Sequence, residues 1–385
     1  MLRTGILMPR STLFPSLGLD ILNGLKENLK KQGLYEKIKL FTDNIGFGVN
    51  EQEIYTKAEK MLLQDDVDIA IVCADTRIAE MLQPLFTSSN KILLMVNFGV
   101  NFPDNWQPAP TTITHSLNFC MHAGLTAKLA ALETNKKAIN VVSYYDGGYR
   151  QCFSMLNSHQ ANGGIPVFNH ITNIKLEAFT LQPVEAFLEG NADVNTLLCL
   201  FAGDQAERFY PEVSPLQKKF NLSLYVSPMM FDASLKDSLP SDFSIEKVKG
   251  YVPWHPTLEN SGNKLFKETY SVATGNSVNY FSLLGWETGL IVSEIIRQKN
   301  SGNTNAKAVV KLLTEKMFDS PRGWMKIDPA TQQSYGPAYL AICNKNFEIT
   351  IKEEINNIEQ EWKEFTGSKL HPGESSSWRN TYLCI

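Results

Sequence analysis

Short apolar runs alternate with amphipathic stretches along most of the chain. Residues 4–8, 67–73 and 92–96 are apolar runs with the length of buried strands, a pattern typical of parallel strands that are covered on both faces. Between the first two runs, apolar residues recur every four positions, which predicts one face of a helix: Leu17, Ile21, Leu25 and Leu29. A loop rich in Pro and Asn near residues 103–110 is expected to precede a helix near 118–132.

A second series of the same kind follows. Strands are predicted at 139–143, 167–171, 197–201 and 222–226, with helical patterns between them. This alternation of strand and helix favours doubly wound parallel sheets. Farther along, an extended piece is expected near 249–253, then helical stretches, and finally a strand pair that suits a hairpin, at 339–343 and 347–351.

One segment pattern occurs twice, at residues 67–80 and 192–207. Each copy has an acidic residue, an apolar strand, a small residue, an Asp (Asp75 or Asp204) and the start of a helix. Two units built alike and far apart in the chain predict two similar lobes. The length of 385 residues also favours two domains over one. We expect Cys73 and Cys199 at corresponding places in two separate sheets.

Composition excludes several classes of partner. The formal net charge is -4, and no basic stripe that nucleic acid would require is present. No run approaches the ~20 apolar residues needed to span a bilayer, so no membrane insertion is expected. The first nine residues resemble a strand rather than a signal peptide. The sequence as given therefore predicts a cytoplasmic location, with a periplasmic location as the alternative if a leader is omitted.

Motifs for catalysis and for cofactors are absent from the sequence. It contains no GxSxG elbow, no P-loop, no HExxH and no GxGxxG after the first strand. The six histidines have no metal-ligand spacing, and the six cysteines form no CxxC pair. We therefore expect no catalytic residue, no cofactor and no metal. An α/β hydrolase or transferase without known motifs stays open as an alternative.

Several segments, in order along the chain, resemble one known family. They are Pro9-Arg10-Ser11-Thr12, the stretch from Lys60 to Asp68, Ser143 to Tyr149, Gly250 to Trp254, Phe266 to Tyr270, Asn279 to Phe281, Gly285 to Gly289, and Pro321 to Trp324 with Ile327-Asp328. This set resembles the type I periplasmic binding proteins, specifically the branch that binds leucine, isoleucine and valine.

The resemblance implies an α/β fold of two doubly wound, Rossmann-like lobes joined by three hinge crossings. The first lobe would comprise residues 1–118 and 252–328, and the second residues 119–251 and 329–365. Residues 366–385 would form a polar tail. In this family the ligand is held between the lobes by hinge closure.

The implied function is non-enzymatic capture of a small solute, amino-acid-like or otherwise polar, for ABC-type transport with a permease as partner. The same fold includes a cytoplasmic amide sensor that regulates a protein partner, and this remains the alternative. A DNA-binding repressor of the superfamily would need an added helix-turn-helix domain, whereas this chain begins directly with the sheet.

Candidate ligand contacts follow the strands, because ligands of open α/β sheets bind beyond the carboxyl ends of strands. In the first lobe they are Ser11, Asp75, Thr76, Asn97, Phe98 and Gly99, and in the second Tyr145, Tyr149 and Asp204, with Trp254 and Tyr280 near the hinge. The resemblance places Thr76 at the position of a hydroxyl that grips the ligand carboxylate. It places Asp204 near that of an acidic residue that pairs with the ammonium.

Each candidate also has a structural interpretation. Asp75 and Asp204 both precede helices, so each is equally compatible with a helix N-cap. The aromatic residues are equally compatible with packing in the core. A carboxylate at Asp75 would repel an anionic ligand if it faced that ligand, which argues against a simple amino-acid site.

Overall fold

The computed structural model describes residues 1–103 and 106–368, and these divide into two compact units. Unit 1 comprises Met1–Leu117 and Glu259–Gly336, and unit 2 comprises Asn118–Leu258 and residues 337–368. The second and third boundaries lie later than the 251/252 and 328/329 expected from the sequence. The third is later because Ser334 and Tyr335 pair with strand β12 of unit 1.

Unit 1 is built on a parallel sheet of five strands in the order β2-β1-β3-β4-β5. The strands are β1 (Leu2–Met8), β2 (Ile38–Asn44), β3 (Ile69–Val72), β4 (Ile92–Asn97) and β5 (Thr112–Ser116). The helices of this unit are α1 (Leu17–Lys31), α2 (Glu51–Leu63), α3 (Arg77–Ser88), α9 (Ser261–Thr274), α10 (Tyr280–Asn300) and α11 (Ala306–Thr314). Strand β5 was not expected from the sequence.

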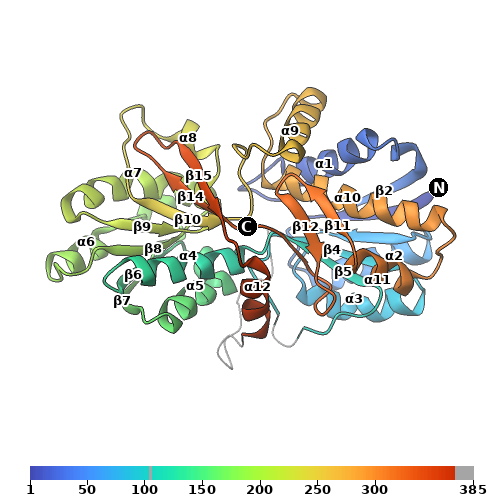
Figure 1. Cartoon of the computed structure of the whole chain (residues 1–385), viewed down its shortest axis with the longest axis horizontal. Coiled ribbons are helices and arrows are strands. Elements are labelled where there is room, and N and C mark those ends of the chain that lie inside the picture. Colours follow the sequence, from blue (N-terminus) through green and yellow to red (C-terminus); the bar gives the residue numbers. More distant parts are fainter. Residues whose placement is uncertain (104–105, 369–385) are drawn as a thin grey trace. The chain divides into compact units, whose positions relative to one another are not determined.

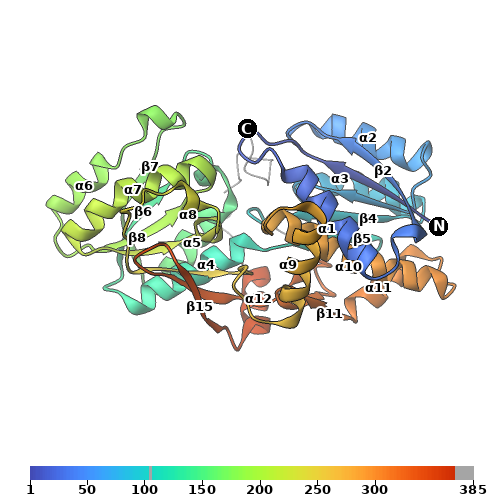
Figure 2. The ribbon, with the colours of Figure 1, turned by 90° about the horizontal axis from the view of Figure 1, so that it is seen from above.

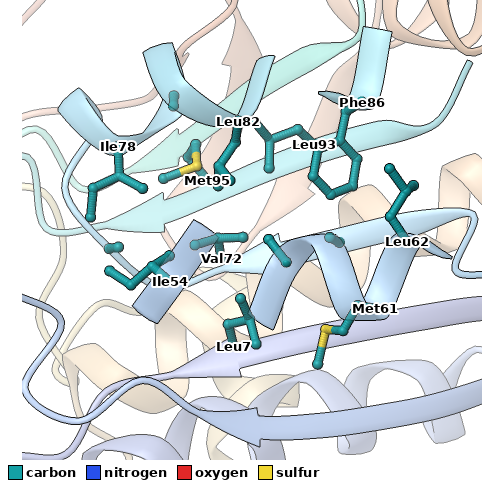
Figure 3. Close-up of a cluster of buried hydrophobic side chains, with 14 of the residues drawn as sticks. Leu7, Ile54, Met61, Leu62, Val72, Ile78, Leu82, Phe86, Leu93 and Met95 are labelled. Atoms are coloured by element: carbon teal, nitrogen blue, oxygen red, sulfur yellow. The ribbon is translucent and has the colours of Figure 1, made fainter. Parts of the chain in front are cut away.

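Helices cover both faces of this sheet. Figure 2 shows α2 and α3 on one face and α1 and α10 on the other. The side chains between α2, α3 and the sheet form a closed apolar cluster (Figure 3) that includes Ile54, Met61, Val72, Leu82 and Phe86. Burial on both faces explains why β3 and β4 are uninterrupted apolar runs. The polar side chains of these strands therefore lie at the strand ends.

Asparagine side chains begin several helices of unit 1. Asn50 accepts a hydrogen bond from the backbone N–H of Glu53, as the spacing of these two residues predicts. Asn260, Asn279 and Asn305 cap α9, α10 and α11 in the same way, and Asn279 forms a reciprocal capping box with Ser282. A small antiparallel sheet completes the unit: β11 (Met317–Ser320), β12 (Gly323–Ile327) and β13 (Ser334–Tyr335).

Unit 2 repeats the plan of unit 1. Its sheet has the order β15-β14-β10-β9-β8-β6-β7, built from β6 (Lys137–Val142), β7 (Ile165–Ile171), β8 (Thr196–Leu200), β9 (Ser223–Val226), β10 (Val248–Val252), β14 (Tyr339–Cys343) and β15 (Ile349–Glu354). The antiparallel pair β14–β15 is the predicted hairpin. In Figure 1 helices α4 and α5 lie on one face of the sheet, and α6 and α7 on the other.

The helices of unit 2 are α4 (Phe119–Glu133), α5 (Arg150–Ala161), α6 (Gln182–Glu189), α7 (Gly203–Phe220), the short α8 (Leu235–Ser238) and α12 (Ile358–Gly367). Among the described residues, no helix is both long enough and apolar enough to cross a membrane.

The repeated segment occupies equivalent strands of two separate sheets, as predicted. β3 lies beside β1 in unit 1, and β8 lies beside β6 in unit 2, so each is the third strand of its series. The two cysteines are not at the same position, however. Cys73 follows the last residue of β3, whereas Cys199 is the penultimate residue of β8. The prediction is therefore confirmed for the strands, but the two cysteines differ by two residues in their position relative to the strand ends.

Helices α1 and α10 pack unusually closely in unit 1. A Cβ atom added at Gly285 would overlap the backbone carbonyl of Ile21, and one added at Gly24 would overlap the backbone of Ser282. One added at Gly289 would lie 2.6 Å from the Cβ of Asn28. Glycine at these positions thus permits contact between the two helix backbones.

We expect Gly285→Ala to lower the free energy of unfolding by about 1–3 kcal/mol, because the added methyl forces the helices apart. The gain in helix propensity from Gly to Ala, about 1 kcal/mol, only partly offsets this. The matched control is Gly367→Ala at the end of α12, where an added Cβ meets no atom within 4 Å. Urea denaturation of both variants measures the difference, and equal stability of the two would contradict the packing argument.

Unit 1 also contains a buried group of charged and polar side chains. The carboxylate oxygen Oε1 of Glu287 accepts hydrogen bonds from Arg322 Nε, at 2.8 Å, and from the Ser320 hydroxyl. Its Oε2 lies 3.3 Å from His115 Nε2. The other imidazole nitrogen of His115 lies 2.9 Å from the hydroxyl of Ser334. Each of these side chains is fully buried, so the residues of β5, α10, β11 and β13 are held by groups that cannot be removed singly without leaving a partner uncompensated.

Burial lowers the pKa of His115 to about 4, with the charge of Glu287 opposing the change and that of Arg322 adding to it. The folded state therefore takes up a proton at lower pH than the unfolded state, whose histidine titrates near 6.5. As pH falls from about 6.5 to 4, this group should remove about 3 kcal/mol of stability.

His115→Gln removes this contribution. We expect the stability difference between wild type and variant to favour the wild type most near pH 7 and to shrink as the pH falls. Urea denaturation at intervals between pH 7 and pH 4.5 tests this. A difference that stays constant across that range would show that His115 does not titrate as described.

Candidate functional site

In each sheet the strand order identifies a switch point, at the carboxyl ends of two neighbouring strands; this end of the sheet is called its edge below. In unit 1, β1 and β3 are neighbours, and in unit 2, β6 and β8 are neighbours, while the connections after them run to opposite sides. At such a switch point the loops beyond the carboxyl ends of the strands diverge, and this is where open α/β sheets bind ligands. Most residues expected at the site follow these strands or their neighbours.

In unit 1, Asp75 lies in the turn between β3 and α3 and is almost fully buried. Its Oδ1 accepts hydrogen bonds from the backbone N–H of Arg77, at 2.9 Å, and from Arg77 Nε, at 3.2 Å. Its Oδ2 accepts one from Asn101 Nδ2, at 2.7 Å. The carboxylate therefore binds the backbone at the start of α3, and its charge is compensated by donors of its own unit, above all by Arg77. The objection that Asp75 would repel an anionic ligand is removed by these contacts.

Thr76 and Asn97 are joined by side-chain hydrogen bonds. Asn97 Nδ2 donates to the Thr76 hydroxyl at 3.1 Å and to the carbonyl of Ala74 at 3.3 Å. Asn97 Oδ1 accepts from the backbone N–H of Gly99 at 2.9 Å. Gly99 has a φ of +68°, a left-handed conformation that glycine adopts without strain. The structure thus brings these three predicted residues together and ties the end of β4 to the end of β3.

The other candidates of unit 1 have structural contacts. Ser11 accepts a hydrogen bond from the backbone N–H of Phe14 at 2.8 Å, which closes a local turn after β1. Phe98 is fully buried, with its ring centroid 5.3 Å from that of Phe281 in an edge-on arrangement. Tyr280 is the buried first residue of α10.

In unit 2, Asp204 lies in the first turn of α7, just beyond β8. Burial raises the pKa of its carboxyl group, the backbone N–H of Gln205 acts against this, and the charge of Glu207 adds to it. Its Oδ1 is buried and has no hydrogen-bond partner among the described residues. A buried acceptor without a partner costs about 1–3 kcal/mol.

Two tyrosines follow β6 at the same edge. Burial raises the pKa of Tyr145, and the negative charge of Asp204 adds to the rise, so these two groups lie within electrostatic reach. The Tyr145 ring is partly exposed and packs edge-on against Tyr144, with centroids 5.8 Å apart. Tyr149 is the buried N-cap residue of α5. Trp254 follows β10 and is also buried.

Between the two tyrosines lies a second buried carboxyl group. Asp146 accepts a hydrogen bond from the Ser143 hydroxyl at 2.5 Å. Burial raises the pKa of Asp146 to about 6, and the hydrogen bond from Ser143 opposes the rise. The structure places a short 3-10 turn at Asp146–Gly148.

Sequence reasoning missed Arg77 and Asn101, the two partners of Asp75. The spacing of Asp75 and Arg77 across a helix start was a usable signal, whereas nothing in the sequence linked Asp75 to Asn101. It also missed a hollow of about 760 Å³ in unit 2 between α4, α5 and α12, whose lining includes Lys128, Asn157 and Phe365. None of the expected site residues lines this hollow. Across the described part of the chain, no group of three or more His, Cys, Asp or Glu residues could hold a metal ion.

Comparison with known proteins is decisive for the family. Residues 3–348 match the model of the family described as periplasmic binding protein. The chain belongs to this family. No curated protein matches the sequence.

Solved structures agree with this fold. A solute-binding protein of an ABC transporter from R. palustris, solved in complex with benzoate, is 18% identical with a TM-score of 0.70 over 92% of this chain and 98% of that one. An ABC transporter substrate-binding protein from Sphaerobacter thermophilus is 15% identical with a TM-score of 0.78, covering 92% and 97%. A branched-chain amino acid ABC transporter ligand-binding protein from Burkholderia xenovorans is 11% identical with a TM-score of 0.73, covering 92% and 95%. At these identities the likeness establishes the fold.

We expect Asp75→Asn to lower the free energy of unfolding by about 1–3 kcal/mol. The amide would turn an NH₂ group toward donors that now bond the carboxylate, leaving buried groups unsatisfied. Asp242→Asn is the control, because Asp242 is an exposed aspartate of unit 2. Chemical denaturation compares the two, and a loss no greater than that of the control would mean that Asp75 does not anchor the loop.

Proposed function

We infer that this protein captures a small polar solute for an ABC-type transporter and catalyses no reaction. The family and the fold support this role, and the permease of such a transporter is the expected protein partner. The ligand would be held by the strand-end residues of both units, with hinge closure as the capture step. The comparisons do not support the alternative of a cytoplasmic sensor that acts through a regulated protein.

The observation that carries the proposal is the buried Oδ1 of Asp204 at the switch point of unit 2, which has no hydrogen-bond partner among residues 1–103 and 106–368. A buried polar atom without a partner calls for an explanation, and a bound group is one of the few available. The neighbouring Tyr145 adds an aromatic ring and a hydroxyl to the same edge. Together they favour a ligand that presents an ammonium or hydroxyl donor near a modest apolar surface.

The negative charge of Asp204 distinguishes between the solutes that the names of the similar structures give. The structure from R. palustris holds benzoate, and the one from B. xenovorans is described as a branched-chain amino acid transport component. Benzoate carries no donor for Asp204 and would meet a like charge there. An amino-acid-like solute brings an ammonium group, so it suits this half of the site better.

Identifying the solute needs two measurements. Native mass spectrometry of protein purified without added ligand detects a bound solute by its mass. Calorimetric titration with L-leucine, L-leucinamide, 4-hydroxybenzoate, putrescine and ribitol then compares the chemical classes. Binding of any of these supports solute capture. Absence of bound solute together with no binding across the panel would overturn the proposed function.

We expect Asp204→Asn to weaken binding of an ammonium-bearing solute by about 10- to 100-fold, since hydrogen bonds to charged groups are worth about 1.5–3 kcal/mol. Binding of ribitol, which has no charge, should change less. The control is Asp242→Asn, at an exposed position of the same unit. Equal affinities in wild type and Asp204→Asn for every member of the panel would place the ammonium contact elsewhere.

A further inference from the structure

The hollow in unit 2 lies apart from the strand ends at which the solute is expected. Its volume is about 760 Å³, which falls within the range of about 300–1,000 Å³ that is usual for small-molecule sites. Helices α4, α5 and α12 line it, and all of the lining residues belong to unit 2. A ligand in the hollow is therefore distinct from a solute bound at the end of β8.

The hollow lies between one face of α4 and one face of α12. Residues that are three and four positions apart lie on the same face of a helix. The lining residues have this spacing on both helices: Met121, Gly124, Leu125 and Lys128 on α4, and Glu361, Glu364, Phe365 and Ser368 on α12. An ion pair between Lys128 Nζ and Glu361 Oε1, at 2.8 Å, connects the two faces.

Part of the lining is apolar. Met121 and Leu125 of α4 are buried residues that line the hollow, and Phe365 of α12 adds a half-buried aromatic ring. Small side chains bring α4 and α5 together beside them, since a Cβ added at Gly124 would lie 3.0 Å from Ser154 Oγ. A ligand with an apolar body gains free energy by removing this surface from water.

The hydroxyl donors of the lining are already engaged within the helices. Ser154 and Ser158 donate to backbone carbonyls of α4, each at 2.7 Å, and Ser368 donates to a carbonyl of its own helix. The side-chain amide of Asn162 donates to the carbonyl of Ser158 at 2.8 Å. A hydroxyl that donates keeps lone pairs that accept, and amide side chains offer donors and acceptors alike. Hydroxyl groups of the lining therefore present acceptors to a ligand.

The charged side chains of the lining add up to one negative charge in excess. They are Lys128, Glu361 and Glu364, and Lys128 is paired with Glu361. Glu364 Oε1 accepts a hydrogen bond from Gln360 at 2.9 Å. A carboxylate has about four acceptor positions, so Glu364 keeps the capacity to accept further donors. Both the charge and the hydrogen-bonding groups of the hollow thus favour a cation over an anion.

We propose that the hollow between α4, α5 and α12 is a second ligand site, which binds a small organic cation with an apolar body. The ammonium group lies at Glu364, and the apolar body lies against Met121, Leu125 and Phe365. This site goes beyond the proposed function, because it is separate from the site of the solute. Its occupant contacts three helices of unit 2, so binding stabilises the folded state by mass action.

The test uses three probes that share a ring and differ in charge. They are 2-naphthylmethylamine, which is a cation at pH 7, 2-naphthylmethanol, which is neutral, and 2-naphthoate, which is an anion. Titration of the full chain, followed by NMR of the probe, should rank their affinities in this order. We expect about fivefold between the amine and the alcohol, the upper value for a partly exposed ion pair. Equal affinities, tighter binding of the anion, or no binding of the amine overturns the proposal.

Two variants locate the probe in the hollow. Glu364→Gln should lower the affinity for the amine to that for the alcohol and leave the alcohol unaffected. Asn157→Phe, which fills part of the hollow from α5, should weaken the binding of all three probes.

The matched control is Glu354→Gln, because Glu354 is an exposed carboxylate of the same unit that does not line the hollow. It should leave the preference for the amine intact. Full preference in Glu364→Gln, equal loss in Glu354→Gln, or unweakened binding in a folded Asn157→Phe overturns the proposal. Circular dichroism and urea denaturation establish that each variant is folded at the assay temperature.

Further outcomes separate this site from the solute site. Loss of the amine preference in Asp204→Asn but not in Glu364→Gln would place the cation at the end of β8, which overturns this inference and leaves solute capture standing. Amine binding that depends on Glu364, in a chain that binds no solute, supports this inference and overturns the proposed function. Amine binding that appears only when the chain is shortened after Ser368 would make residues 369–385 the occupant, which also overturns the inference.

Discussion

Burial of the parallel strands on both faces is the constraint on which the rest of this structure depends. β3, β4 and β8 have no exposed residue, since helices cover their sheets from both sides. A polar side chain within such a strand would need a partner in the core. Polar residues therefore collect beyond the strand ends, and the doubly wound order concentrates them at one edge of each sheet. Fold and candidate site follow from the same requirement.

The two units meet this requirement differently. At the ends of β3 and β4, the carboxylate of Asp75 and the amide of Asn97 find their partners within unit 1. At the end of β8, Asp204 keeps one buried oxygen without a partner in the described chain. A buried acceptor that lacks a partner gains stability when a hydrogen-bond donor arrives.

Unit 1 buries a charged pair that is costly to desolvate, and this pair holds several elements in a defined arrangement. Glu287 and Arg322 are fully buried and hydrogen-bonded to each other, although two charges lose much hydration in such a place. Their contacts join α10 to the strands β11 and β12, and His115 adds β5. Glycines of α1 and α10 also bring the backbones of these two helices into contact. These interactions decide how the late segment of the chain returns to the first sheet.

The apolar periodicity of the sequence determined most strands and the repeated unit, and the resemblance of several segments pointed to the family. Buried runs such as residues 69–73 can be recognised in the sequence because every residue in them is apolar. β5 escaped detection because Thr-Ile-Thr-His-Ser is a polar sequence that becomes buried only in the folded chain, where it pairs with β4 and contacts residues 333 and 334. Likewise, Asp75 was visible as an acidic residue at a strand end, but its partner Asn101 was not. The sequence by itself determined which residues lie at the strand ends. Tertiary structure alone decided which of them are satisfied, because hydrogen-bond partners 26 or 219 positions apart leave no local pattern.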